Sequence, residues 1–202
     1  MENESQAHGQ ILQIFLDETT GAFQSYKKLA EQAVEQVSDD EFFKTVDAES
    51  NSLATICKHV GGNLKSRWTD FLTTDGEKPS RNRDAEFSAD GDTRETIRQT
   101  WENGFQTLFE TLQSLTAADL DKIVQIRSGD FTVVKAINRA MMHTASHVGQ
   151  IQFLAKHLRS NDWKTLSVPK NQSAEFTDWL RNKDDKGSHL EATGEFAKRD
   201  LK

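Results

Sequence analysis

His143 and His147 stand four residues apart in a stretch that has no proline between Phe131 and Arg159. On an α-helix, side chains four residues apart lie one above the other on the same face. Two neutral imidazoles in this arrangement are able to hold one metal ion. The residues between them are Thr-Ala-Ser, so the glutamate of the HExxH metalloprotease motif is missing. The pair therefore indicates a metal site that lacks this general base.

The position of the pair on its helix decides whether a third ligand can reach it. At about 100° per residue, His147 lies about 60° and His143 about 100° from the centre of the apolar stripe. His59 lies at the corresponding shoulder of an earlier helix, beside Asn63 and Arg67. The two polar shoulders are able to face each other across a shallow cleft. Alternatively, the HxxxH spacing arises by chance, and the histidines are ordinary core-edge or surface residues. The stripe consists of Ile137, Met141, Thr144, Val148, Ile151 and Ala155.

The charge and composition of the chain exclude several classes of protein. A net charge of −7 argues against a general nucleic-acid surface, which needs a basic face. We find neither a basic amphipathic helix nor a run of about 18 apolar residues, so we expect no membrane partner. The N-terminus has no apolar segment typical of a signal peptide. The single cysteine, Cys57, excludes an internal disulfide and fits a reducing compartment. We therefore expect a soluble, cytoplasmic protein.

Helical periodicity organises most of the chain. Apolar residues recur three or four positions apart in four long segments, which predicts four amphipathic helices. A capping pattern at Ser38 opens a short turn, and Ile123–Phe131 predicts a short hairpin. These features predict an all-α bundle of four helices with a long loop after its second helix and a hairpin before its last. The helices are expected at about 8–37, 48–72, 93–115 and 132–158.

The remaining segments leave alternatives open. The polar connection 73–92 is longer than most helix–helix connections, and it forms either a lid over the site or a loop packed elsewhere. Gly61-Gly62 is costly inside a helix, which a close neighbouring backbone, a bound group or a kink would explain. We assign residues 1–176 to a single domain and residues 177–202 to a flexible polar tail.

Two motifs together resemble a known superfamily. The stretch from Cys57 to Pro79 contains H-x-x-G-N-x-x-S-R-W-T-D-F-L, and the stretch from Ala136 to His157 contains H-x-x-x-H-V-G-Q-I. This combination resembles the DinB/YfiT-like superfamily, and more narrowly a bacterial branch of unknown function. The resemblance covers roughly residues 10–176.

The resemblance implies a dimeric antiparallel four-helix bundle with a divalent transition metal held by His59, His143 and His147. Zinc and nickel are the leading metals, although three nitrogens also suit copper and iron. Some relatives transfer a low-molecular-weight thiol to an electrophile, and many have no demonstrated activity. The name of the superfamily suggests DNA repair, which the acidic chain does not support.

Four further residues are candidates around this site. Gln150 and Asn63 stand one turn from His147 and His59, where they would orient a ligand or serve a structural role. Arg67 and Arg139 would hold a substrate carboxylate or form surface salt bridges.

The leading hypothesis is a metal-dependent enzyme whose ion activates a small thiol or water, with thiol transfer preferred over hydrolysis. Its substrate would be a small molecule, and a low-molecular-weight thiol would be the cosubstrate. The alternative is a non-catalytic, metal-binding or stress-related dimeric helical protein.

Overall fold

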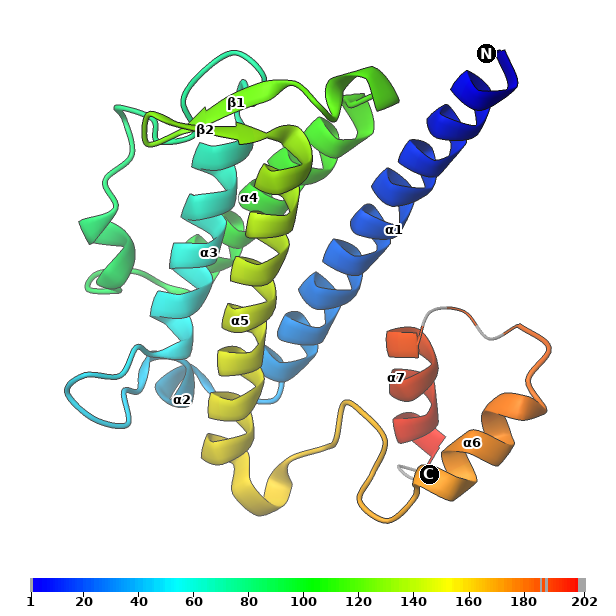
Figure 1. Ribbon diagram of the computed structural model, residues 1–202. Helices are drawn as coiled ribbons and strands as arrows, with labels where there is room; N and C mark the ends of the chain where they lie inside the picture. Colours follow the sequence, from blue (N-terminus) through cyan, green and yellow to red (C-terminus); the bar gives the residue numbers. More distant parts are fainter. Residues whose placement is uncertain (1, 186, 188, 200–202) are drawn as a thin grey trace.

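The computed structural model describes residues 2–185, 187 and 189–199, and it is mainly helical with one two-stranded sheet (Figure 1). None of the described helices has an apolar stretch long enough to cross a membrane. The elements confirm the mainly helical fold and the short hairpin that the sequence predicts. The α-helices are α1 (Glu2–Val34), α2 (Asp39–Phe43), α3 (Leu53–Trp68), α4 (Arg94–Ser114), α5 (Val133–Arg159), α6 (Ser173–Arg181) and α7 (His189–Arg199). The strands are β1 (Ile123–Ile126) and β2 (Gly129–Thr132), and short 3₁₀ helices lie at Asp84–Phe87, Ala117–Asp119 and Ser160–Asp162.

The four long helices lie where periodicity predicts them, but their ends differ by a few residues. Helix α3 begins at Leu53 and not near residue 48, because the Ser52 side chain accepts the N–H of Thr55 and caps the helix. It ends at Trp68, and Asp70 takes a positive φ of 48° just beyond. The capping box expected at Ser38 is present, and Thr93 forms a further one at the start of α4.

Helices α1, α3, α4 and α5 surround one hydrophobic core. Helix α3 packs most extensively against α4, and α1 packs against α5. The apolar stripe predicted for α5 is buried except for Met141, which is half-buried. The largest fully buried side chains of this core include Phe23, Leu53, Leu64, Trp68, Ile97, Phe105, Leu108 and Ile137.

Helices α3 and α4 run in the same direction. Thr111 donates a hydrogen bond to the carbonyl of Trp68, and Gly104 lies against the carbonyl of Gly61. In both contacts the α4 residue stands the same number of positions after its α3 partner. A separation that stays constant along two helices means that they run parallel. In the antiparallel bundle that the resemblance implies, successive helices run in opposite directions. The pair α3 and α4 departs from this expectation. The long segment after α3 explains the difference, because it returns the chain to the end where α3 began (Figure 1).

Close approach of α3 and α4 accounts for one of the two adjacent glycines. A Cβ atom on Gly61 would lie 2.5 Å from the carbonyl oxygen of Thr100 in α4. A Cβ atom on Gly104 would lie 2.4 Å from the carbonyl oxygen of Gly61. The close backbone of α4 therefore explains why a glycine stands at position 61. This is one of the three alternatives that the sequence left open.

The hairpin is held at the end of α3 by the loop that follows that helix. β1 and β2 pair antiparallel, with Ile126 opposite Gly129. Arg127 and Ser128 form the turn with φ values of 54° and 60°, which residues other than glycine rarely adopt. Asp75 stabilises this turn, because its carboxylate accepts the N–H groups of Arg127 at 2.8 Å and Ser128 at 2.6 Å.

The C-terminal region contains two helices where the sequence indicated a polar tail. Helices α6 and α7 form a small hydrophobic cluster of their own, which includes Phe176, Ala192 and Phe196. Trp179 packs on this cluster, whereas Trp163 and Leu166 pack on the main core. The predicted boundary between domain and tail remains a prediction, as does the mobility of the tail.

Candidate metal centre

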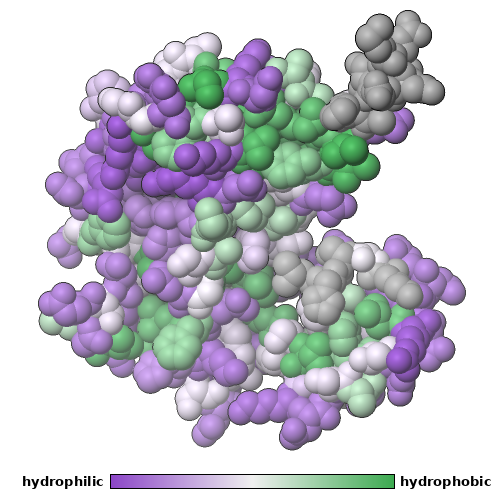
Figure 2. All heavy atoms as spheres, in the orientation of Figure 1, coloured by the Kyte–Doolittle hydropathy of each residue, from purple (hydrophilic) through white to green (hydrophobic). Residues whose placement is uncertain are grey.

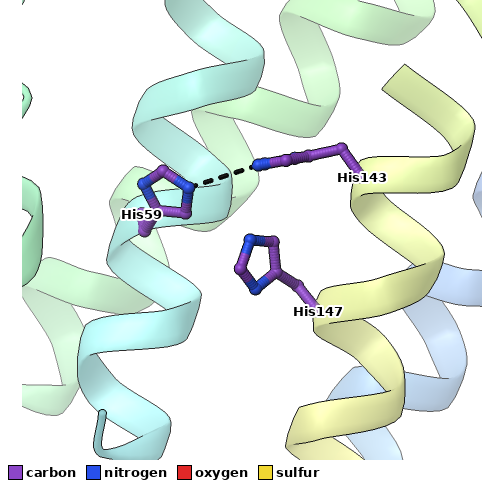
Figure 3. A group of neighbouring side chains, drawn as sticks. All are labelled: His59, His143 and His147. Atoms are coloured by element: carbon purple, nitrogen blue, oxygen red, sulfur yellow. Dashed lines mark hydrogen bonds between the residues drawn. The ribbon is translucent and has the colours of Figure 1, made fainter. Parts of the chain in front are cut away.

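Helices α3 and α5 bring His59, His143 and His147 together. One nitrogen from each imidazole lies within 4.8 Å of the others (Figure 3). His59 is buried, with 5% of its surface exposed, and the other two histidines are half-buried. The three rings turn toward a common space between the helices (Figure 3). The three predicted ligands are therefore close enough to hold one metal ion, and the two ligands on α5 are partly exposed.

The nitrogen spacing fits a tetrahedral ion. Imidazole nitrogens about 2.0–2.1 Å from a tetrahedral zinc ion are about 3.3–3.4 Å apart. The Nε2 atoms of His59 and His143 lie 3.3 Å apart. Two of the three rings are thus already placed as two corners of such a tetrahedron.

Glu86 fixes the orientation of the buried histidine. The Nδ1–H group of His59 donates to the Glu86 carboxylate at 3.0 Å. This bond leaves the lone pair of His59 on Nε2, which faces His143. Carboxylate partners of this kind orient metal-ligating histidines and raise their basicity. The Phe87 ring also packs on His59, with 4.5 Å between ring centroids.

Arg81 holds the Glu86 carboxylate in its charged form. The Nε and Nη2 groups of Arg81 each donate to one carboxylate oxygen at 2.7 Å. Both side chains are buried, with 4% and 9% of their surfaces exposed. Burial raises the pKa of Glu86, but the bonds from Arg81 and His59 outweigh it and lower this pKa below its usual value. The series of hydrogen bonds from Arg81 through Glu86 to His59 therefore turns the Nε2 lone pair of His59 toward the cluster.

The two histidines of α5 are held neutral. His147 Nδ1–H donates to the side-chain oxygen of Gln150 at 2.7 Å, which leaves Nε2 for a ligand. Burial, followed by repulsion from His147 and His59, lowers the pKa of His143 to about 3. Burial also lowers the pKa of His147, against the opposing effect of the Gln150 bond. Neutral imidazole is the form that coordinates metals, so these residues fit a metal ion.

Three of the four other predicted residues line a cavity beside the cluster. Asn63, Arg67 and Arg139 line a narrow cavity of about 10 Å³ together with His143. Arg67 is buried and forms an ion pair with Glu77 at 2.8 Å, whereas Arg139 is exposed. Gln150 is the candidate that bonds directly to one of the three histidines.

Sequence reasoning missed Glu86 and Arg81, which both belong to the polar segment 73–92. The segment therefore reaches the site from behind His59, and it packs against α3 through its short 3₁₀ helix. Gly62 is the feature of the sequence that could have indicated a group packed against α3 at this point. A Cβ atom there would lie 2.7 Å from Glu86 Oε1, so the second adjacent glycine makes room for this carboxylate.

A larger cavity of about 620 Å³ lies between α1 and α4, and none of the three histidines lines it. The buried thiol of Cys57 does, and burial raises its pKa to about 12. A thiol with this pKa is a poor nucleophile at neutral pH. We therefore place the candidate chemistry at the histidines and not at this cavity.

The fold and site together define a mainly helical protein with a three-histidine cluster on two of its long helices. A family model described as a protein of unknown function, DUF1572, matches residues 10–172. The chain belongs to this family. No curated protein matches the chain. Helices α6 and α7 lie beyond the matched region.

Proposed function

We propose that the protein is a divalent-metal-dependent enzyme in which His59, His143 and His147 hold the ion. The observation that carries this proposal is the convergence of their three ligand nitrogens within 4.8 Å. Three histidines leave at least one coordination position open, as in catalytic rather than structural zinc sites. When bound, such an ion would lower the pKa of a coordinated water or thiol. Zinc and nickel are the metals that we propose.

The protein's own residues orient two of the three ligands. Glu86 and Gln150 hold the Nδ1–H groups of His59 and His147, so that neither ring turns away from the cluster. Arg81 keeps Glu86 ionised and therefore an acceptor. The exposed flank of α5 admits a small molecule, because His143 and His147 are only half-buried.

We propose thiol transfer in preference to hydrolysis, and the resemblance to the DinB/YfiT-like superfamily supports this choice. That superfamily places its ligands on the second and last helices of a four-helix bundle, which the positions of α3 and α5 match. The thiol sulfur would form a bond to an electrophilic carbon, the leaving group would depart, and the thiol proton would pass to solvent. Cys57 is buried and lines the cavity between α1 and α4, away from the face that carries His59, so the thiol would be an external cosubstrate in a cytoplasmic setting.

Elemental analysis of protein purified without a polyhistidine tag tests metal binding. We expect about one equivalent of a transition metal, and a large loss in His143→Ala and His59→Ala. His157→Ala is a matched control, because His157 is exposed near the end of the same helix as His143. Less than about 0.2 equivalent in the wild-type protein, unchanged in His143→Ala, would refute the metal site.

A conjugation assay tests the chemistry separately. Metal-loaded protein is incubated with a low-molecular-weight thiol and monochlorobimane, and bimane fluorescence reports the conjugate. We expect the wild-type rate to exceed that of His59→Ala. Equal rates with full metal occupancy in the wild type would refute thiol transfer and leave the metal site standing.

Exposed hydrophobic residues favour a second candidate, a non-catalytic dimeric helical protein that binds metal. Met142 and Phe153 on α5 are 67% and 75% exposed, and Ile11 and Ile14 on α1 are also exposed. Hydrophobic residues gather on the visible face near the N-terminal part of α1 (Figure 2). This surface supports the proposal of a homodimer under either function.

A further inference from the structure

Arg67 carries buried donors that have no partner. Its side chain is 8% exposed, and its Nη2 group donates to Glu77. Its Nε and Nη1 atoms are buried and make no hydrogen bond to any described residue. A buried donor without a partner is costly, and a charged donor more so. An acceptor that arrives with a ligand would remove this cost.

Arg67 lines the narrow cavity beside His143. Asn63, Arg139 and His143 complete its polar wall, and Trp68 and Ile126 contribute apolar surface. The volume of about 10 Å³ has room for one water molecule or for the end of a longer molecule. A ligand that enters here therefore lies directly beside the three-histidine cluster.

Positive charge is concentrated around this cavity, although the whole chain has a net charge of −7. One carboxylate, Glu77, is shared by Arg67, Arg81 and Arg127 at distances of 2.8, 3.4 and 3.0 Å. Arg139 makes no ion pair with any residue in the part of the chain that the structure describes. Burial lowers the pKa of Arg67 against the opposing attraction of Glu77, and repulsion from the three neighbouring arginines lowers it further. Glu86 also pairs with Arg81, and Asp75 lies at the hairpin turn, so four guanidinium groups face three carboxylates.

We propose that this cavity, the Arg67–Arg139 pocket, binds the carboxylate of an acidic small molecule whose remaining atoms reach the three-histidine cluster. The assignment rests on the proposed function and names its substrate class. A carboxylate that enters this cavity would meet the Arg67 side chain, and the unpartnered nitrogens would donate charge-assisted hydrogen bonds to it. Asn63 would donate a further bond from its amide. Arg139, exposed at the rim, would attract the anion and close over it.

Nuclear magnetic resonance of the arginine Nε–H groups tests this pocket with succinate as the probe. We expect a saturable shift of the Arg67 signal with succinate and none with succinamide, which has the same shape without charge. Arg139→Gln should weaken succinate binding at least about tenfold, because a charged partner is lost. Arg98→Gln is the matched control, since Arg98 is exposed and pairs with Glu95 far from the cavity.

The titration is run on metal-free and zinc-loaded protein, so that the pocket and the metal site are tested separately. A saturable shift without zinc supports the pocket even if the metal proposal fails. Three results would overturn the pocket: no saturable shift in either form, equal affinity in Arg139→Gln, or an equal shift with succinamide. Arg67→Gln, checked for folding by circular dichroism, should abolish binding while metal content stays unchanged.

Discussion

At the scale of single residues, the histidines of α5 combine burial with solvent access. Because burial lowers the pKa of His143 to about 3, its imidazole stays neutral over a wide pH range in the folded protein. In the unfolded chain the same group titrates near 6.5. Between these values the unfolded state binds more protons, so the free energy of unfolding decreases as the pH falls from 6.5 toward 3.

We therefore expect His143→Asn to flatten this pH dependence. Urea unfolding of the metal-free protein between pH 7 and pH 4.5 should show a smaller loss of stability for His143→Asn than for the wild type. His157→Asn should keep the wild-type slope, because His157 is exposed. Parallel curves for all three proteins would contradict a lowered pKa at His143.

Glu86 orients His59 through a carboxylate that Arg81 also contacts. Glu86→Gln keeps the shape of the side chain but removes the charge that His59 and Arg81 both contact. Loss of such a carboxylate partner typically costs 10–100-fold in metal affinity, and we expect a loss of about this size. Competition with a chromophoric zinc chelator measures it.

Glu95→Gln is the control for this change, because Glu95 pairs with Arg98 in an exposed position. Circular dichroism separates weaker binding from unfolding. Equal zinc affinity in folded Glu86→Gln and wild-type protein would show that the carboxylate does not tune the site.

At the scale of elements, the contact of α3 with α4 sets the position of His59. Gly61 lies two residues after His59, and its Cα lies against the backbone of α4. Gly61→Ala would place a methyl group 2.5 Å from the Thr100 carbonyl, so the helices must separate. We expect a loss of about 1–3 kcal/mol in the free energy of unfolding, measured by urea denaturation.

Gly21→Ala in α1 is the matched control for this substitution. Gly21 is an exposed glycine in a helix with no heavy atom within 4 Å of its added Cβ. Replacing it should raise stability by up to about 1 kcal/mol, because alanine is the better helix former. A stabilising effect of Gly61→Ala would contradict the close packing of α3 on α4.

At the scale of the whole molecule, one outer face of α5 is the surface on which the proposed dimer would form. Met142, Ser146, Gly149 and Phe153 recur at helical spacing, and all four are exposed. Small residues between two large apolar ones allow two helices to approach closely. This face adjoins His143 and His147 in the sequence, so a partner copy would border the site.

We expect Phe153→Glu to convert a dimer into a monomer, because a charge would be buried in the contact. Sedimentation equilibrium measures the mass. Val46→Glu should leave the mass unchanged, since Val46 is also exposed but lies between α2 and α3. A wild-type monomer, or a dimer that survives Phe153→Glu, would contradict this interface.

Local patterns of the sequence determined the long helices, the hairpin and the register of the histidine pair. The buried stripe Ile137, Val148 and Ile151 follows from spacing alone, because a helix repeats every 3.6 residues whatever surrounds it. The same register placed His143 and His147 beside each other. Helix geometry made His59 a possible third ligand, and the family motifs then favoured it, although no local rule connects it to α5.

Tertiary structure alone decided how these pieces meet. The parallel run of α3 and α4 depends on a crossover whose path no periodicity encodes. The bond between His59 and Glu86 spans 27 residues, and the contact between His59 and His143 spans 84. Such contacts depend on how whole helices and a long polar loop pack. The sequence therefore identified the three imidazoles, and packing decided which of their nitrogens face one another.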